Sequence, residues 1–144
     1  MNPALVLIVA LLGGIAIALQ AQFAGVLETR MGTFDALAVS FVSGGIVIAA
    51  ARLAAGGVDL AVWRRAPWWA YLVGVLALVI VGAVGFAAPR IGLVSTLATV
   101  TIAQFVAGSA IAHFGWFRGT AQPVDLETIL GIGLLCLGGW LILR

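Results

Sequence analysis

Residues 68–115, WWAYLVGVLALVIVGAVGFAAPRIGLVSTLATVTIAQFVAGSAIAHFG, decide the fold of this chain. Arg90 is the single Arg, Lys, Asp or Glu in the stretch, and Pro89 and Gly92 flank it. On either side lies an apolar run of about 20 residues, the length that a helix needs to cross about 30 Å of hydrocarbon. The stretch therefore predicts two membrane-spanning helices joined by a short turn.

Further runs of the same kind fill the rest of the 144 residues. The predicted spans are residues 4–27, 34–53, 68–88, 93–115 and 126–143. A composition of 64% hydrophobic and 8% charged residues, with a mean hydropathy of +1.25, excludes a water-soluble domain. We expect an all-α integral membrane protein in which residues 1–144 form a single five-helix domain.

The polar residues exclude several classes of protein. The arginines are scattered, so they form no basic patch for nucleic acid, and we expect them to meet lipid headgroups. Cys136 is the single cysteine, which rules out an intrachain disulfide. No span carries a Ser with His and acid, paired aspartates or a metal-ligand cluster. We therefore expect no enzyme activity, no metal and no cofactor.

Arginine counts leave the orientation in the membrane open. Five spans put the termini on opposite sides. The side with the N-terminus carries four arginines and the other side three; they are Arg52, Arg64, Arg65 and Arg118 against Arg30, Arg90 and Arg144. Cytoplasmic loops normally hold a clear excess of basic residues. Either the N-terminus is cytoplasmic, or the chain inserts in both orientations and pairs with an inverted copy of itself.

The odd number of spans favours the second interpretation. Many transporters place their solute site between two repeats of inverted topology, and one five-helix chain supplies only one such half. An antiparallel, dual-topology homodimer would supply both halves. A parallel dimer or a monomer with a hidden orientation bias remains the alternative.

Polar residues inside the spans are the candidates for a solute site, because polar groups in a bilayer face protein or water. Gln20 shares a helix face with Gly13, Ala16 and Ala24, whereas Gln22 lies about 200° away. The residues expected to contact a solute are Gln20, Phe41, Ser43, Thr101, Gln104 and Phe105. The alternative for the glutamines is a hydrogen bond between neighbouring helices.

Ionisable residues are scarce within the spans. No Asp or Glu lies deep in any span, so coupling by a mid-membrane acid is not expected. Glu28 is a candidate for a proton or vestibule role at the end of the first span. His113 is a second candidate because imidazole titrates near neutral pH, although a lone interfacial histidine is more often structural.

Several motifs resemble the YdcZ family of the drug/metabolite transporter superfamily, over nearly the whole chain. They are Pro67-Trp68-Trp69, Pro89-Arg90 with Gly92, Gln104, and His113-Phe114-Gly115, together with Gln20, Leu27, Gly32, Ser40, Phe41 and Gly44. The chain departs from the family pattern at Ala24, Ala103 and Ala112. The resemblance implies a multi-pass bacterial inner-membrane protein that moves small organic solutes, and larger members of the superfamily look like fused inverted repeats.

These observations give one leading function and two alternatives. The leading hypothesis is a transporter, expected to export a small organic solute, in which two inverted protomers work by alternating access. A dual-topology ion channel is the first alternative. A membrane subunit that stabilises a partner without transporting anything is the second.

Overall fold

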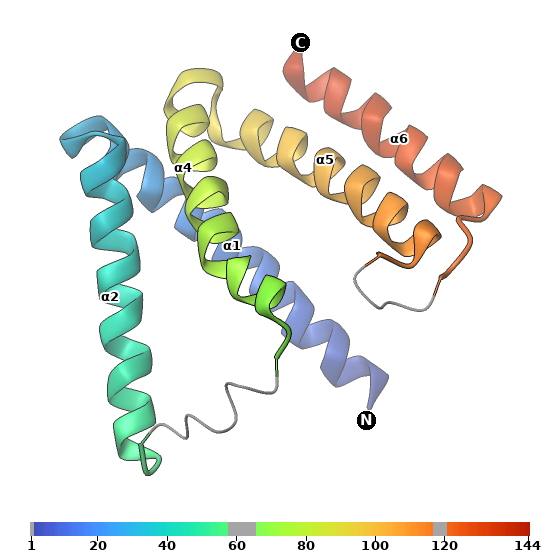
Figure 1. The fold of residues 1–144 in the computed structure, drawn as a ribbon. Coiled ribbons are helices and arrows are strands. Elements are labelled where there is room, and N and C mark those ends of the chain that lie inside the picture. The colour runs from blue at the N-terminus through green and yellow to red at the C-terminus, as the bar shows by residue number, and fades with distance from the viewer. Residues whose placement is uncertain (1, 58–65, 117–120) are drawn as a thin grey trace. The chain divides into compact units, whose positions relative to one another are not determined.

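The computed structural model describes residues 2–57, 66–116 and 121–144 (Figure 1). In these ranges the regular structure is helical, and five helices are long and apolar enough to cross a membrane. Their bounds are α1 Pro3–Met31, α2 Thr33–Ala54, α4 Val73–Ile91, α5 Leu93–Phe114 and α6 Leu126–Leu143. A 3₁₀ turn, η1 Trp68–Leu72, leads into α4. The predicted all-α membrane fold is confirmed.

Two helices extend beyond the ends expected from the apolar runs. Helix α1 continues to Met31, which carries Glu28 onto the helix. Helix α4 continues past Ala88 to Ile91 with Pro89 inside its last turn. A proline this close to the end of a helix removes one backbone donor without breaking a long ladder of bonds. The apolar runs therefore predict each helix, but they place the C-terminal ends of α1 and α4 too early in the sequence.

Single glycines connect α1 to α2 and α4 to α5. Gly32 has φ 82° and Gly92 has φ 87°, a backbone region that residues with a Cβ rarely adopt. Each glycine carbonyl accepts the first bond of the next helix, from Ala36 N at 3.1 Å and from Thr96 N at 3.0 Å. Each junction between these helices is thus a single residue long.

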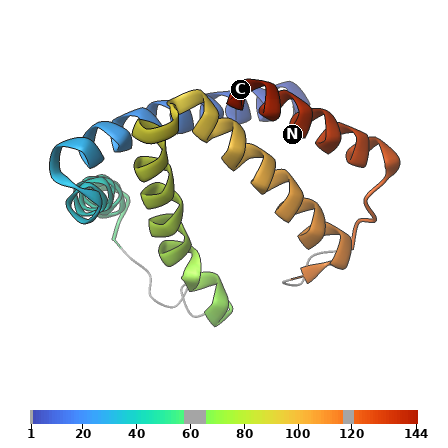
Figure 2. The same cartoon turned by 90° about the horizontal axis from the view of Figure 1, so that it is seen from above.

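The chain divides into two compact units, Met1–Arg90 and Ile91–Arg144. In the first unit, small residues bring α1 and α4 into close contact at their C-terminal ends (Figures 1 and 2). A Cβ built on Gly85 would lie 3.5 Å from both the Cβ and the carbonyl oxygen of Ala24. Gly25 faces Ala88 and Pro89 in the same way. The expectation of one domain over residues 1–144 stays a prediction.

In the second unit, α5 and α6 lie side by side and run in opposite directions (Figures 1 and 2). Gly139 is buried on α6, and the side chain of Ile102 on α5 occupies the space that a Cβ at this glycine would need. The absence of a side chain at Gly139 therefore allows the close approach of the two helices.

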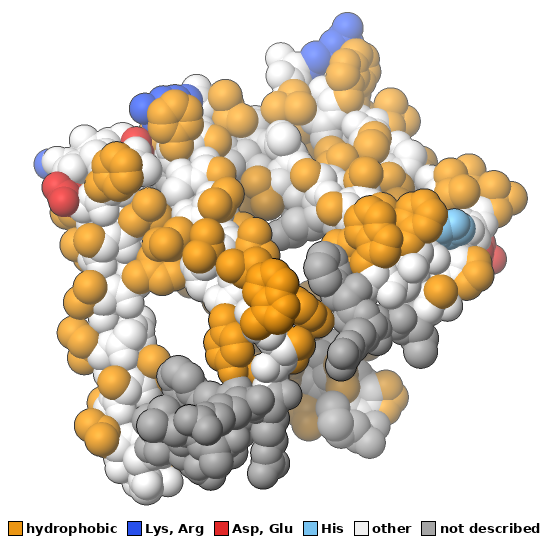
Figure 3. Space-filling view, viewed as in Figure 1, with side chains coloured by type: hydrophobic (Ala, Val, Ile, Leu, Met, Phe, Trp, Pro, Cys, Tyr) orange, Lys and Arg blue, Asp and Glu red, His pale blue; other side chains and the backbone are white. Residues whose placement is uncertain are grey.

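Apolar side chains cover the helices along their length, and Arg, Asp and Glu gather at helix ends (Figure 3). Leu11, Val47 and Leu134 are examples of large apolar residues that are about 70% exposed on the single chain. Such a surface suits lipid or another apolar helix. Arg64, Arg65 and Arg118 lie outside the described residues, so the balance of arginines between the two sides stays a prediction.

Candidate functional site

A cavity of about 400 Å³ in the first unit brings Gln20 of α1 together with Ser43 of α2. Ala16, Ala24 and Ser40 line it as well. The Ser43 hydroxyl donates to the Ser40 carbonyl at 3.0 Å. Among the described residues the Gln20 amide has no hydrogen-bond partner, and the side chain is exposed. The amide is therefore free to bind a solute or a facing helix.

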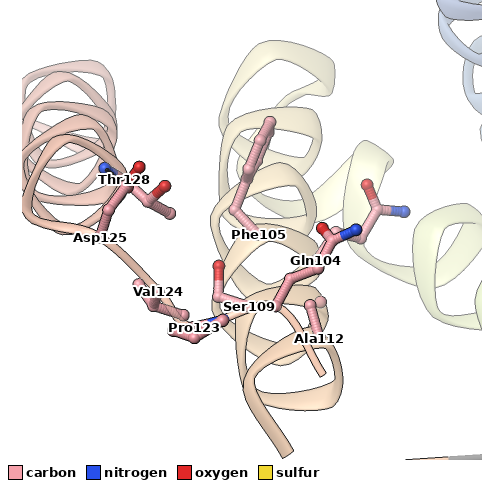
Figure 4. A pocket seen from close by; sticks show the side chains of 10 residues that line it. Gln104, Phe105, Ser109, Ala112, Pro123, Val124, Asp125 and Thr128 are labelled. Atoms are coloured by element: carbon pink, nitrogen blue, oxygen red, sulfur yellow. Dashed lines mark hydrogen bonds between the residues drawn. The ribbon is translucent and has the colours of Figure 1, made fainter. Parts of the chain in front are cut away.

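A second cavity of about 550 Å³ lies between α5, the start of α6 and the segment before it (Figure 4). Helix α5 contributes Gln104, Phe105 and Ser109 to its lining. Asp125 and Thr128 lie on the opposite side at the first turn of α6 (Figure 4). The cavity therefore combines two of the predicted contact residues with polar groups that the sequence analysis did not select.

Two of the predicted contact residues lie elsewhere. Thr101 lines a neighbouring apolar cavity of about 510 Å³ between α5 and α6, among residues such as Leu97 and Leu135. Phe41 is half-buried on α2 and is not among the residues that line the cavity of Gln20 and Ser43. Gln104 and Phe105 thus share one cavity, Gln20 and Ser43 share another, and Thr101 and Phe41 belong to neither.

His113 holds the segment before α6 against the end of α5. Its Nδ1 accepts a hydrogen bond from Val124 N at 3.2 Å, and the Ala112 carbonyl accepts one from Gln122 N at 2.9 Å. The Phe114 ring packs edge-on against the imidazole at 5.0 Å between centroids. These contacts favour the structural role for His113, and its role in proton transfer stays untested.

Asp125 begins α6 as its N-cap. One carboxylate oxygen accepts a hydrogen bond from Thr128 N at 2.8 Å. Hydrogen bonds from the Thr128 side chain and backbone lower the pKa of Asp125 below its usual value of 3.8. The group is therefore a carboxylate at neutral pH. The signal in the sequence is an acid three residues before a Thr at the start of an apolar run, which is typical of a helix N-terminus.

Glu28 is paired at the junction of α1, α2 and α4. Its side chain is 9% exposed, and one oxygen lies 3.6 Å from Arg90 Nη1. The Thr33 hydroxyl donates to the same oxygen at 3.1 Å. Beside this group is a cavity of about 10 Å³ that Ser40 also lines, which is room for about one water molecule. The structure therefore gives Glu28 a partner, Arg90, that the sequence analysis did not identify.

Arg90 is itself held in place by its own helix. Its guanidinium lies over the Phe86 ring at 3.5 Å from the centroid, and the Phe86 carbonyl accepts a hydrogen bond from it. Among the described residues no group of three or more His, Cys, Asp or Glu side chains is placed to hold a metal ion. Of the ionisable groups described above, Glu28 and Arg90 thus form a pair, and Asp125 caps a helix.

Apolar spanning helices with polar cavities between them define the class: a multi-pass integral membrane protein. The family follows from comparison with known sequences. Residues 5–141 match the model of the family described as "Putative inner membrane exporter, YdcZ". The chain belongs to the YdcZ family and is a membrane transporter of the inner membrane. No curated protein and no solved structure matches it.

Proposed function

We propose that this chain exports a small organic solute as an antiparallel homodimer that works by alternating access. The observation that carries the proposal is a pair of cavities with polar residues in their lining, one with Gln20 and Ser43 and the other with Gln104 and Ser109. Each has the size range of small-molecule sites, about 300 to 1,000 Å³. The described lining of the first cavity comes from α1 and α2, and that of the second from α5, the start of α6 and the segment before it. Each is open on the single chain, and a facing surface would close it.

A second, inverted copy is well suited to provide that surface. The amides of Gln20 and Gln104 are exposed on the single chain, and a polar group that faced lipid directly would be costly. In an inverted pair each cavity meets a surface of the other protomer, as in transporters built from inverted repeats. The odd number of spans supports the same arrangement.

The site assignment is tested with two glutamines of α1. Gln20→Ala removes an amide that lines the cavity, whereas Gln22 is absent from its lining. We expect Gln20→Ala and Gln104→Ala each to lower solute flux about five- to tenfold, the effect of losing one hydrogen bond worth about 1 kcal/mol. Gln22→Ala should stay within twofold of the unchanged protein.

The measurement is uptake into proteoliposomes of choline, mannitol and isethionate, which represent a cation, a neutral solute and an anion. Flux of any of the three above that of empty liposomes supports transport, and flux of none contradicts it for these classes of solute. Equal losses for Gln20→Ala and Gln22→Ala would contradict the site. Single-channel currents would indicate a channel instead.

Dual insertion is tested separately with reporters at the C-terminus. Two reporters, each active on only one side of the inner membrane, are fused after Arg144. Because arginine is almost balanced between the two sides, we expect both reporters to be active in comparable amounts. Activity of one reporter alone would contradict the antiparallel dimer and leave the cavity assignment intact.

A further inference from the structure

The cavity between α5 and α6 has an ionic character that the sequence alone did not suggest. Asp125 is the one ionisable residue in its lining as the structure describes it. The other polar groups there are neutral amides and hydroxyls, from Gln104, Ser109, Gln122 and Thr128. No described Arg or Lys lines the cavity. A carboxylate without a basic partner among these residues attracts a positively charged ligand and repels an anion.

Other charges at this end of α6 determine how strong the field is. The N-terminus of a helix carries about half a positive charge, which offsets part of the Asp125 charge. Glu127 in the same turn is also negative, but it lies outside the lining of the cavity and acts on a ligand there only from a greater distance. His113 is nearby, and its Nδ1 accepts a hydrogen bond from Val124 N. Among the described groups, the charges of Asp125, Glu127 and the helix N-terminus sum to a negative value.

Asp125 also keeps binding capacity while it caps the helix. An ionised carboxylate offers about four acceptor sites on its two oxygens. Thr128 donates to this carboxylate from its backbone N–H at 2.8 Å and from its side chain, which leaves about two acceptor sites. The Asp125 side chain is exposed, so further acceptor sites remain open to a ligand. The capping bonds hold the carboxylate in place and leave acceptor sites on its oxygens for a ligand.

The remaining walls suit the rest of an organic cation. Phe105 is 51% exposed and lines the same cavity as Asp125, and an aromatic face attracts a cation. The neighbouring apolar cavity along the same two helices, lined by Leu134 and Leu135, can accept a hydrocarbon part. The ligand that fits these surfaces has one positive charge and an apolar body.

We propose that the cavity between α5 and α6 binds an amphipathic organic cation, with Asp125 as the charge that selects it. The inference rests on the proposed transport function, because it names the class of solute. Binding of the cation can also be measured independently of solute flux.

The test uses the purified full chain in detergent and three benzyl or phenyl probes of similar size. Benzyltrimethylammonium is the cation, benzyl alcohol the neutral probe and benzenesulfonate the anion, and calorimetry measures their affinities. We expect the cation to bind at least tenfold more tightly than the other two. Equal affinities, or no binding of the cation, would overturn the proposal.

Asp125→Asn isolates the charge from the cap, because Asn caps a helix about as well as Asp. We expect this change to weaken binding of the cation about fivefold or more and to leave the thermal unfolding of the protein unchanged. Glu127→Gln is the matched control, since it removes an equal charge from the same turn outside the lining of the cavity. It should change the affinity less than twofold, and an effect as large as that of Asp125→Asn would overturn the proposal.

Failure of this inference differs visibly from failure of the transport proposal. Selective binding of the cation that Asp125→Asn weakens, without flux in proteoliposomes, would sustain the binding site and contradict transport. Flux of mannitol or isethionate by a protein that does not bind the cation would sustain transport and contradict the binding site.

Discussion

Arg90→Ala is expected to lower the free energy of unfolding by about 2 kcal/mol. The change leaves the Glu28 carboxylate without its cation, and this side chain is only 9% exposed. Breaking a buried ion pair on one side costs about 3 to 5 kcal/mol. The Arg90 side chain is 49% exposed, so we expect a smaller loss. The protein is unfolded in mixed detergent micelles, and circular dichroism measures the helix content during unfolding.

Two further variants separate the ion pair from other effects of the change. Arg30→Ala removes an exposed arginine from the last turn of α1 and should change the stability by less than about 0.5 kcal/mol. Combining Arg90→Ala with Glu28→Gln should recover part of the loss, because a neutral amide needs no cation and can still accept from Thr33. If the double variant is no more stable than Arg90→Ala, the unpaired charge is not the cause.

Gly85→Leu is expected to have the largest effect on packing. A Cβ at this position would lie 3.5 Å from the Ala24 Cβ and 3.5 Å from the Ala24 carbonyl oxygen. These distances are ordinary contact, but the further carbons of leucine would meet the backbone of α1, which cannot rotate away. Overpacking typically costs about 1 to 3 kcal/mol, and we expect the upper end of that range in the same unfolding measurement.

One matched control changes the same position, and the other changes a different position on the same helix. Gly85→Ala adds only the Cβ that the space accepts, and alanine favours a helix over glycine by about 1 kcal/mol. It should be neutral or stabilising. Gly74→Leu places leucine on α4 where no atom lies within 4 Å, and should be tolerated. A loss for Gly74→Leu as large as that for Gly85→Leu would contradict the role given to the contact between α1 and α4.

Local sequence was sufficient to predict the helices, because each span is a continuous apolar run of the length that a bilayer requires. Gln20 and Gln104 were selected from single helices, where helical spacing shows which residues share a face. Which of the selected residues share a cavity could not be found in that way. Ser43 lines the same cavity as Gln20 because α2 folds back along α1, and that arrangement depends on the turn at Gly32.

Contacts between distant residues account for what the sequence analysis missed. Glu28 and Arg90 were both read as charges at span ends, and only the packing of α4 against α1 makes them a pair. Asp125 likewise lies just before an apolar run in the sequence. It lines a cavity with Phe105 because α5 and α6 are antiparallel neighbours. A residue two helices away in the sequence carries no local signal of such contacts.

The glycine turns at Gly32 and Gly92 have a consequence for the direction of transport. With five spans, both one-residue turns lie on one side of the membrane, and the longer connections between α2 and η1 and between α5 and α6 lie on the other. A lone protomer is thus strongly asymmetric across the bilayer. In the antiparallel pair that we propose, each leaflet holds the glycine turns of one protomer and the longer connections of the other. The inward-open and outward-open states are then related by a two-fold axis in the membrane plane. Without a gradient they have equal energy, with an equilibrium constant of one between them. Export by the proposed pair would therefore be set by the gradients across the membrane and not by the structure of the pair.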